Sequence, residues 1–132
     1  MNVATLAAAL IASWEDLRLV AYLDSGGVWT IGLGHTAGVK EGDTCTPEQA
    51  AAWYAVDAAP VLALVTDEPL VAAAAYVSFG YNCGRGALEL VLAGKAELNH
   101  FVHDKHGNTL GGLVRRRAAE AALIASVAPI SA

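Results

Sequence analysis

The stretch EDLRLVAYLDSGGVWTIGLGHT, residues 15–36, decides the fold because a complete β-hairpin pattern follows directly on a helical one. Branched and aromatic residues flank Ser25-Gly26-Gly27, which is typical of a turn between two strands. Upstream, apolar residues recur at three- and four-residue steps over residues 3–16, the spacing of an amphipathic helix. The sequence therefore predicts a helix followed by a small sheet.

The hairpin also gathers polar side chains on one face. If its loop has three residues, Asp24 pairs across from Val28 and lies diagonal to Thr30. Strand alternation then separates a polar face from an apolar one. The polar face holds Asp24, Val28, Thr30, Gly32 and Gly34, and the apolar face holds Trp29, Ile31 and Leu33. The two missing side chains leave room for a bulky polar ligand, whereas a two-residue turn would put Thr30 on the wrong face.

Glu15 lies near the end of the apolar helix, beside Trp14 and Leu17. Apolar neighbours that partly desolvate a carboxyl raise its pKa, so that it can stay protonated as a general acid. Two carboxylates in unequal environments are the chemistry of glycoside hydrolysis, which makes Glu15 and Asp24 candidates. Such a pair taken alone also fits two solvated surface groups.

The rest of the chain reads as helices. In TPEQAAAWYAVDAAPVLALV (46–65), Thr46 is predicted to cap a helix that Pro60 kinks or breaks. EPLVAAAAYVSFGYNCG (68–84) predicts a helix that ends near Cys83 or Gly84. Shorter helices over about 86–103, the polar loop HDKHGNTLGG (103–112) and a final helix LVRRRAAEAALIASVA (113–128) complete the chain.

Composition limits the class of protein. A chain of 132 residues fits one domain, and its formal net charge of -5 disfavours a nucleic-acid partner. The apolar start is far shorter than the roughly 20 residues of a membrane span, and no Lys or Arg precedes it. We therefore expect no signal peptide and no stable membrane insertion. Cys45 and Cys83 are interpreted as free thiols, with a single bridge left open.

Several histidines invite comparison with catalytic or metal sites. His35 follows the glycines of the hairpin and is expected to be a hydrogen-bonded structural residue rather than a catalytic base. His100, His103 and His106 with Asp104 have a spacing that could hold a metal. Their ligand set is incomplete, so a solvated helix end is the preferred interpretation and no metal is expected.

Other polar residues keep two interpretations each. The arginines at 115–117 are either solvated or supply an ion pair to Glu15, which would oppose the rise in its pKa. Tyr22 and Asn82 could line a substrate cleft, although packing or capping explains each of them equally well.

The segment 15–36 closely resembles the signature of the phage-type lysozymes, the endolysin muramidases: E-G-x-R-L-x-A-Y-x-D-x-x-G-x-W-T-I-G-Y-G-H-T. Only Asp16 and Leu33 depart from its fixed positions. SFGYNCG (78–84) is similar to the family's SFxFNVG, and GGLVRRRAAEAAL (111–123) to its PGLVRRREAExAL. Between these two segments the chain looks shorter than common members, and the STLxxxLN segment is not recognisable.

The resemblance implies an α+β, lysozyme-like fold. A small β-hairpin lobe (about 18–45) would pack on a mainly helical lobe (about 1–17 and 46–132), with the active-site cleft between them. The shorter region is expected to alter the outer wall of that cleft.

The resemblance also implies cleavage of the β-1,4 bond between N-acetylmuramic acid and N-acetylglucosamine in peptidoglycan. The family's catalytic Glu, Asp and Thr fall on Glu15, Asp24 and Thr30, with Glu15 as general acid and the other two holding water in an inverting reaction. Tyr22, Gly32, Gly34 and Asn82 are the candidate substrate-binding residues. No cofactor is expected, and the enzyme would be a monomer held in the host cytoplasm until a separate membrane pore forms. The alternatives are a lytic transglycosylase and an inactive glycan-binding module.

Overall fold

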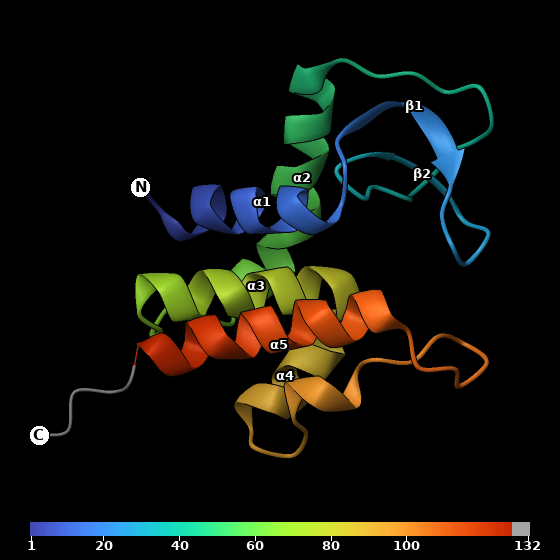
Figure 1. Ribbon diagram of the computed structural model, residues 1–132. Helices are drawn as coiled ribbons and strands as arrows, with labels where there is room; N and C mark the ends of the chain where they lie inside the picture. The colour runs from blue at the N-terminus through green and yellow to red at the C-terminus, as the bar shows by residue number, and fades with distance from the viewer. Residues whose placement is uncertain (128–132) are drawn as a thin grey trace, which may run out of the picture.

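The structure is a computed structural model that describes residues 1–127 (Figure 1). Its elements, in chain order, are α1 (Val3–Trp14), β1 (Arg18–Leu23), β2 (Trp29–Gly32), α2 (Pro47–Leu62), α3 (Leu70–Cys83), α4 (Arg85–Leu92), the 3₁₀ helix η1 (Leu98–His100) and α5 (Gly111–Ser126). The two strands form one antiparallel sheet. The expected α+β class is confirmed.

Helix α1 ends earlier than the sequence suggested. The side chain of Asn2 caps its first turn by accepting a hydrogen bond from the Thr5 N–H at 2.8 Å. The helix stops at Trp14 rather than at Asp16, and Glu15 already has an extended backbone (φ -118°, ψ 120°). The apolar periodicity continues past the real end because the chain turns directly into β1, and this places Glu15 at the junction of helix and sheet.

The hairpin loop has three residues, which is the condition on which the predicted faces depended. Tyr22 pairs with Thr30 and Leu23 with Trp29, and the Asp24 N–H donates to the Val28 carbonyl at 2.9 Å. The predicted strand alternation holds only as far as Gly32, where β2 ends.

Beyond β2 the chain folds back on itself. Ile31 and His35 exchange two backbone hydrogen bonds of 2.9 Å each, which close a tight turn over Gly32, Leu33 and Gly34. The predicted faces of β2 therefore do not extend to Gly34. The turn instead brings Gly34 up to the acid at the end of α1.

The helix start predicted at Thr46 is confirmed in detail. Thr46 Oγ1 accepts from the Gln49 N–H at 3.1 Å, and Gln49 Oε1 accepts from the Thr46 N–H at 2.9 Å. Pro60 lies inside the last turn of α2, which ends at Leu62. Proline has no N–H to bond the carbonyl four residues earlier, and α2 continues for only two residues beyond it.

Helix α3 is the centre of the helical part, and α1, α2, α4 and α5 all pack against it (Figure 1). Its small, fully buried side chains allow the neighbouring helices to approach closely; they are Ala72, Ala73, Ala74 and Ala75. A second apolar cluster joins α1, the Gly32–Gly34 turn and α2 through Ile11, Leu33, Tyr54 and Ala58. This cluster fixes the hairpin against the helices and so sets the position of the site.

The C-terminal third differs from expectation only at element ends. Helix α5 begins at Gly111 rather than at Leu113, and the predicted end at residue 128 lies outside the described residues. The polar loop before α5 contains a small bridge between His103 and Thr109. Cys45 and Cys83 are both free, as predicted.

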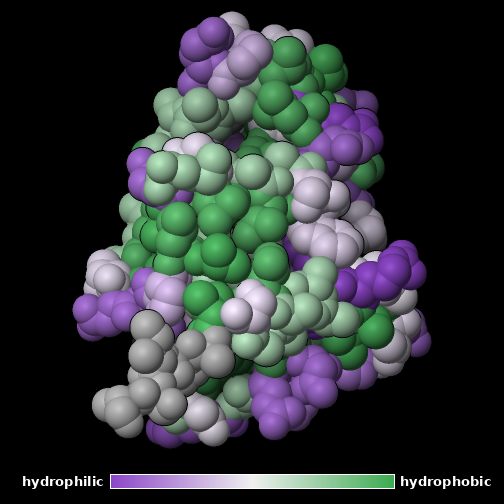
Figure 2. Space-filling model, turned by 60° about the vertical axis from the view of Figure 1, so that its left-hand side comes forward, coloured by the Kyte–Doolittle hydropathy of each residue, from purple (hydrophilic) through white to green (hydrophobic). Residues whose placement is uncertain are grey.

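One face of the molecule has an apolar centre. Seen from the side where α1 begins, hydrophobic residues fill the middle of the face (Figure 2). Within residues 1–127, no helix combines the length and the apolar character needed to cross a membrane.

Candidate active site

Glu15 has the features of a general acid. Its Oε2 atom is buried and has no hydrogen-bond partner within residues 1–127. Burial raises the pKa of Glu15, the guanidiniums of Arg116 and Arg117 oppose that rise, and the negative charge of Asp24 adds to it. A buried, unpartnered carboxyl favours its protonated form, which is the form that can donate a proton.

The Gly32–Gly34 turn forms the surface next to this acid. A Cβ atom at Gly34 would lie 3.1 Å from Glu15 Oε2, so the glycine lets the backbone approach the carboxyl. A Cβ at Gly32 would instead meet Ala50 Cβ at 3.2 Å, so helix α2 occupies the space beside Gly32. Tyr81, from α3, donates its hydroxyl to the Leu33 carbonyl at 2.5 Å and ties this turn to the helical core.

Asp24 and Thr30 both belong to the hairpin, and Asp24 is close enough to Glu15 to affect its pKa. Asp24 Oδ1 accepts from the N–H groups of Gly26 and Val28, both at 2.8 Å, which fixes the carboxylate at the loop. Thr30 is 3% exposed, and its hydroxyl donates to the Val28 carbonyl at 2.9 Å. In both residues the side chain is held by backbone groups while some acceptor capacity is left for a water molecule.

Tyr22 faces the same region, and Asn82 has a structural partner. Tyr22 pairs with Thr30 across the hairpin. The pKa of Tyr22 is raised by burial and by the charge of Glu15, so the side chains of Tyr22 and Glu15 are close enough to interact. Asn82 is exposed at the end of α3, where its Oδ1 accepts from Arg117 Nη2 at 2.8 Å. Roles of Tyr22, Gly32, Gly34 and Asn82 in substrate binding stay predictions.

The three arginines do not behave alike. Arg115 is exposed, whereas Arg116 and Arg117 are only 4% and 1% exposed and form ion pairs with Glu120 at 3.2 and 2.7 Å. None of the ion pairs among residues 1–127 includes Glu15. The arginines thus lower the pKa of Glu15 from a distance rather than through the direct ion pair that was one of the two expectations.

The contacts of Glu120 with Ser78 and with the two buried arginines were not predicted from the sequence. Glu120 accepts a hydrogen bond from Ser78 at 2.6 Å as well as pairing with both arginines. The only signal was spacing, since Glu120 follows Arg116 and Arg117 at four and three residues, where side chains on one helix face meet.

His35 has the structural role that was expected. Its Nδ1 lies 2.6 Å from Asp57 Oδ2, and its ring stacks on Trp53 with centroids 4.6 Å apart. Both partners belong to α2, so His35 fastens the turn beside the acid to that helix. In the part of the chain that the structure describes, no three His, Cys, Asp or Glu side chains are arranged as metal ligands.

Two surface hollows border this region. One is lined by Gly34, Tyr81 and Arg85, and the other by Trp14, Leu110 and Arg115. The partly buried carboxyl of Glu15 and the second carboxylate in the neighbouring hairpin are groups of the kind that a glycosidase uses.

Comparison with known proteins agrees with this class. The phage lysozyme family model matches residues 12–120. The endolysin of Acyrthosiphon pisum secondary endosymbiont phage 1 is 33% identical over 146 positions, covering 96% of this chain and 99% of that endolysin. The chain therefore belongs to the phage lysozyme family, and it is a glycosidase that acts on peptidoglycan.

Solved structures show the same fold. The endolysin from Escherichia coli O157:H7 phage FAHEc1 superposes with a TM-score of 0.76 at 29% identity, covering 98% of this chain and 97% of that one. The active form of the P1 phage endolysin Lyz gives a TM-score of 0.77 at 26% identity, covering 92% and 83%. The muramidase domain of SpmX from Asticaccaulis excentricus gives 0.70 at 31% identity, covering 89% and 93%.

Proposed function

We propose that the enzyme hydrolyses the β-1,4 bond between N-acetylmuramic acid and N-acetylglucosamine by inversion, with Glu15 as general acid. The observation that carries this proposal is the buried, unpartnered Oε2 of Glu15 beside the Gly34 turn. Glu15 donates its proton to the glycosidic oxygen as the bond to the anomeric carbon breaks. A water molecule attacks that carbon from the opposite face of the sugar.

Asp24 and Thr30 hold the attacking water in this scheme, and Asp24 accepts its proton. Support comes from their rigid placement, because backbone N–H groups hold Asp24 Oδ1 and the Val28 carbonyl holds the Thr30 hydroxyl. The charge of Asp24 also adds to the rise in the pKa of Glu15, which supports placing the two carboxyls near each other. An inverting enzyme needs that region to be wide enough for a water between them.

The wider setting of the enzyme is part of the same proposal. The chain acts as a single domain, with residues of about 18–45 forming one wall of the cleft and the helices the other. It works as a monomer, without a cofactor, on the glycan strands of peptidoglycan. Its likeness to phage endolysins supports accumulation in the host cytoplasm and release to the wall through a separate membrane pore.

Digestion of purified peptidoglycan tests the reaction. Mass analysis should find reducing ends with one water added, and proton NMR of the first-formed product should show the α-anomer. Glu15→Gln should lower the rate by roughly 100- to 10,000-fold, because it removes the general acid. The exposed Glu41 supplies the matched control, and Glu41→Gln should keep the parent rate.

Three results would change the proposal, each in a different way. Anhydro-sugar ends would identify a lytic transglycosylase, and a first-formed β-anomer would identify a retaining mechanism. A folded Glu15→Gln variant that lyses walls at the parent rate would remove Glu15 from the reaction.

A further inference from the structure

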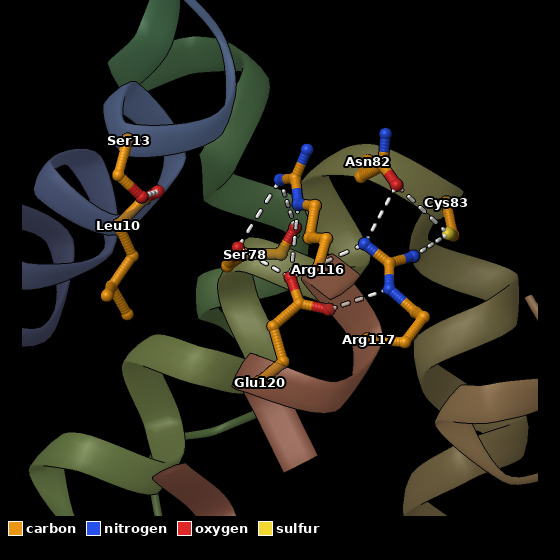
Figure 3. Close-up of polar contacts among 8 residues, drawn as sticks. All are labelled: Leu10, Ser13, Ser78, Asn82, Cys83, Arg116, Arg117 and Glu120. Atoms are coloured by element: carbon orange, nitrogen blue, oxygen red, sulfur yellow. Dashed lines mark hydrogen bonds and ion pairs between the residues drawn. The ribbon is translucent and has the colours of Figure 1, made fainter. Parts of the chain in front are cut away.

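A cluster of charged side chains is buried between α3 and α5. Its members, here called the arginine–glutamate cluster, are Ser78, Arg116, Arg117 and Glu120, each at most 4% exposed. Glu120 is at the centre, with both guanidiniums and the Ser78 hydroxyl directed at its carboxylate (Figure 3). Burying charges is costly unless they are paired, so the carboxylate is needed to keep two guanidiniums in this position.

The cluster lies close enough to Glu15 to influence it, yet makes no ion pair with it. Both guanidiniums act on Glu15 electrostatically, but their ion pairs all go to Glu120. Glu15 Oε2 is meanwhile buried without a hydrogen-bond partner in the described chain. Among residues 1–127, Glu120 thus forms ion pairs with two guanidiniums, and Glu15 forms none.

The two arginines differ in how firmly they are held. Arg117 also donates from Nη1 to Cys83 Sγ at 2.6 Å and from Nη2 to Asn82 Oδ1 at 2.8 Å, so α3 fixes its far end. Arg116 bonds Glu120 through Nε and Ser78 through Nη2. Its other terminal nitrogen points away from the cluster in Figure 3, with no contact drawn to it. Without Glu120, Arg116 would keep bonds from Nη2 alone, to the carbonyl and hydroxyl of Ser78, whereas Arg117 would keep bonds from both terminal nitrogens. Arg116 is therefore the guanidinium that loss of Glu120 would release more easily.

We propose that Glu120 is a positioning residue for the reaction: it retains the guanidiniums of Arg116 and Arg117, so that neither pairs with Glu15. The acid is then left free to carry and donate its proton. The inference rests on the assignment of Glu15 as general acid. It concerns a residue that touches neither the substrate nor the reacting atoms.

Within residues 1–127, the charged and titratable groups that interact electrostatically with Glu15 enter the test. They are Arg116 and Arg117 from α5, Asp24 from the hairpin loop, Tyr22 from β1 and Tyr81 from α3. A guanidinium released toward Glu15 would favour its charged form. The acid would then lose its proton at lower pH, and activity, which needs the protonated form, would be lost at lower pH too.

Glu120→Gln tests the proposal, because the amide keeps the shape but removes the charge. The alkaline limb of the kcat/KM profile should move to lower pH by about one unit. The ¹³C shift of the labelled Glu15 carboxyl, assigned with Glu15→Gln, should titrate lower by a similar amount. This second readout does not depend on catalysis, so it separates failure of this inference from failure of the proposed function.

The double variant Arg116→Gln/Glu120→Gln distinguishes positioning from general damage. Arg116→Gln removes the released guanidinium, so the alkaline limb of the kcat/KM profile should return toward its position in the parent enzyme. If Glu120→Gln acted only by disturbing the packing, adding Arg116→Gln would move the limb further from that position. If Glu120→Gln fails to fold, Ser78→Ala carries the test, since it removes one hydrogen bond to Glu120 and one from Arg116 without changing any charge. It should shift the limb in the same direction by less. An unchanged Glu15 titration in a folded Glu120→Gln variant would overturn the proposal. If Glu120→Gln does not fold, an unchanged Glu15 titration in Ser78→Ala would overturn it.

Discussion

Two constraints favour glycine at position 34: a positive φ angle and the close approach of its backbone to Glu15. Its φ of +75° is strained for any residue with a side chain, and a Cβ there would lie 3.1 Å from Glu15 Oε2. Gly34→Ala should cost roughly 1–2 kcal/mol in stability through the backbone alone. It should also displace the acid and reduce kcat by far more than that loss of stability explains.

Gly38 provides the control. It has a similar φ of +71°, but no atom lies within 4 Å of where its Cβ would be. Gly38→Ala should therefore lose similar stability while keeping its activity below the melting temperature. Equal kcat values for the two variants would show that Gly34 serves the backbone and not the acid.

The raised pKa of Glu15 has a cost in stability. A carboxyl whose pKa is higher in the folded than in the unfolded chain binds its proton more tightly when folded. Its contribution to stability is present at low pH and is lost as pH rises from the unfolded value through the folded one. Glu15→Gln, which never ionises, should therefore raise the melting temperature near pH 7 and have little effect near pH 4.

Thermal melts at the two pH values measure this difference. Glu41→Gln, at an exposed position, should change the melting temperature little at either pH. If Glu15→Gln destabilises the protein at pH 7, then the ionised Glu15 has a stabilising partner that its unpartnered Oε2 does not reveal.

For single residues, the sequence predicted where a residue lies along its helix or strand better than which residues from other elements it contacts. Local periodicity placed Glu15 near the end of the first helix, and strand alternation placed Asp24 opposite Val28 once a three-residue loop was assumed. The pairing of Glu120 with Ser78 could not be predicted, since it depends on how α5 packs across α3. Such contacts between distant elements leave no regular spacing in a single sequence.

Among the elements, α3 depends most on small residues. A Cβ at Gly80 would lie 2.9 Å from Val61 Cγ1 and 3.0 Å from Leu88 Cδ2, in a core where both neighbours are buried. Gly80→Ala should therefore destabilise by about 1–3 kcal/mol through overpacking, less the roughly 1 kcal/mol that alanine gains as a helix former.

Gly86, in α4, allows the gain in helix propensity from alanine to be measured without overpacking. No atom lies within 4 Å of its Cβ position, so Gly86→Ala should be neutral or stabilising in the same denaturant titration. A Gly80→Ala variant as stable as Gly86→Ala would mean that α2 and α4 can move aside from α3 at little cost.

Element types were predictable and element ends were not. The capping box at Thr46 marked the start of α2 because capping is a local hydrogen-bond pattern. The early end of α1 and the turn after Gly32 were missed for a shared reason. In both places the hydrophobic pattern continues while the backbone changes direction to bring Glu15 and Gly34 together.

At the scale of the whole molecule, the net charge of -5 is unusual for an enzyme proposed to act on an anionic wall. Like charges slow the approach of enzyme to substrate, and salt screens them. Raising the salt from about 0.01 to 0.15 M shortens the Debye length from about 30 to 8 Å. Lysis of intact walls should therefore become a few-fold faster over this range, whereas a basic enzyme would become slower.

An uncharged substrate separates this long-range effect from the site itself. Cleavage of a neutral chitin-like oligosaccharide should vary little over the same salt range, because it has no charge for the protein to repel. Equal acceleration on both substrates would assign the salt effect to the charged groups around Glu15. Slower lysis of walls with added salt would mean that a local positive surface, such as the exposed Arg115 beside Trp14, outweighs the net charge in binding.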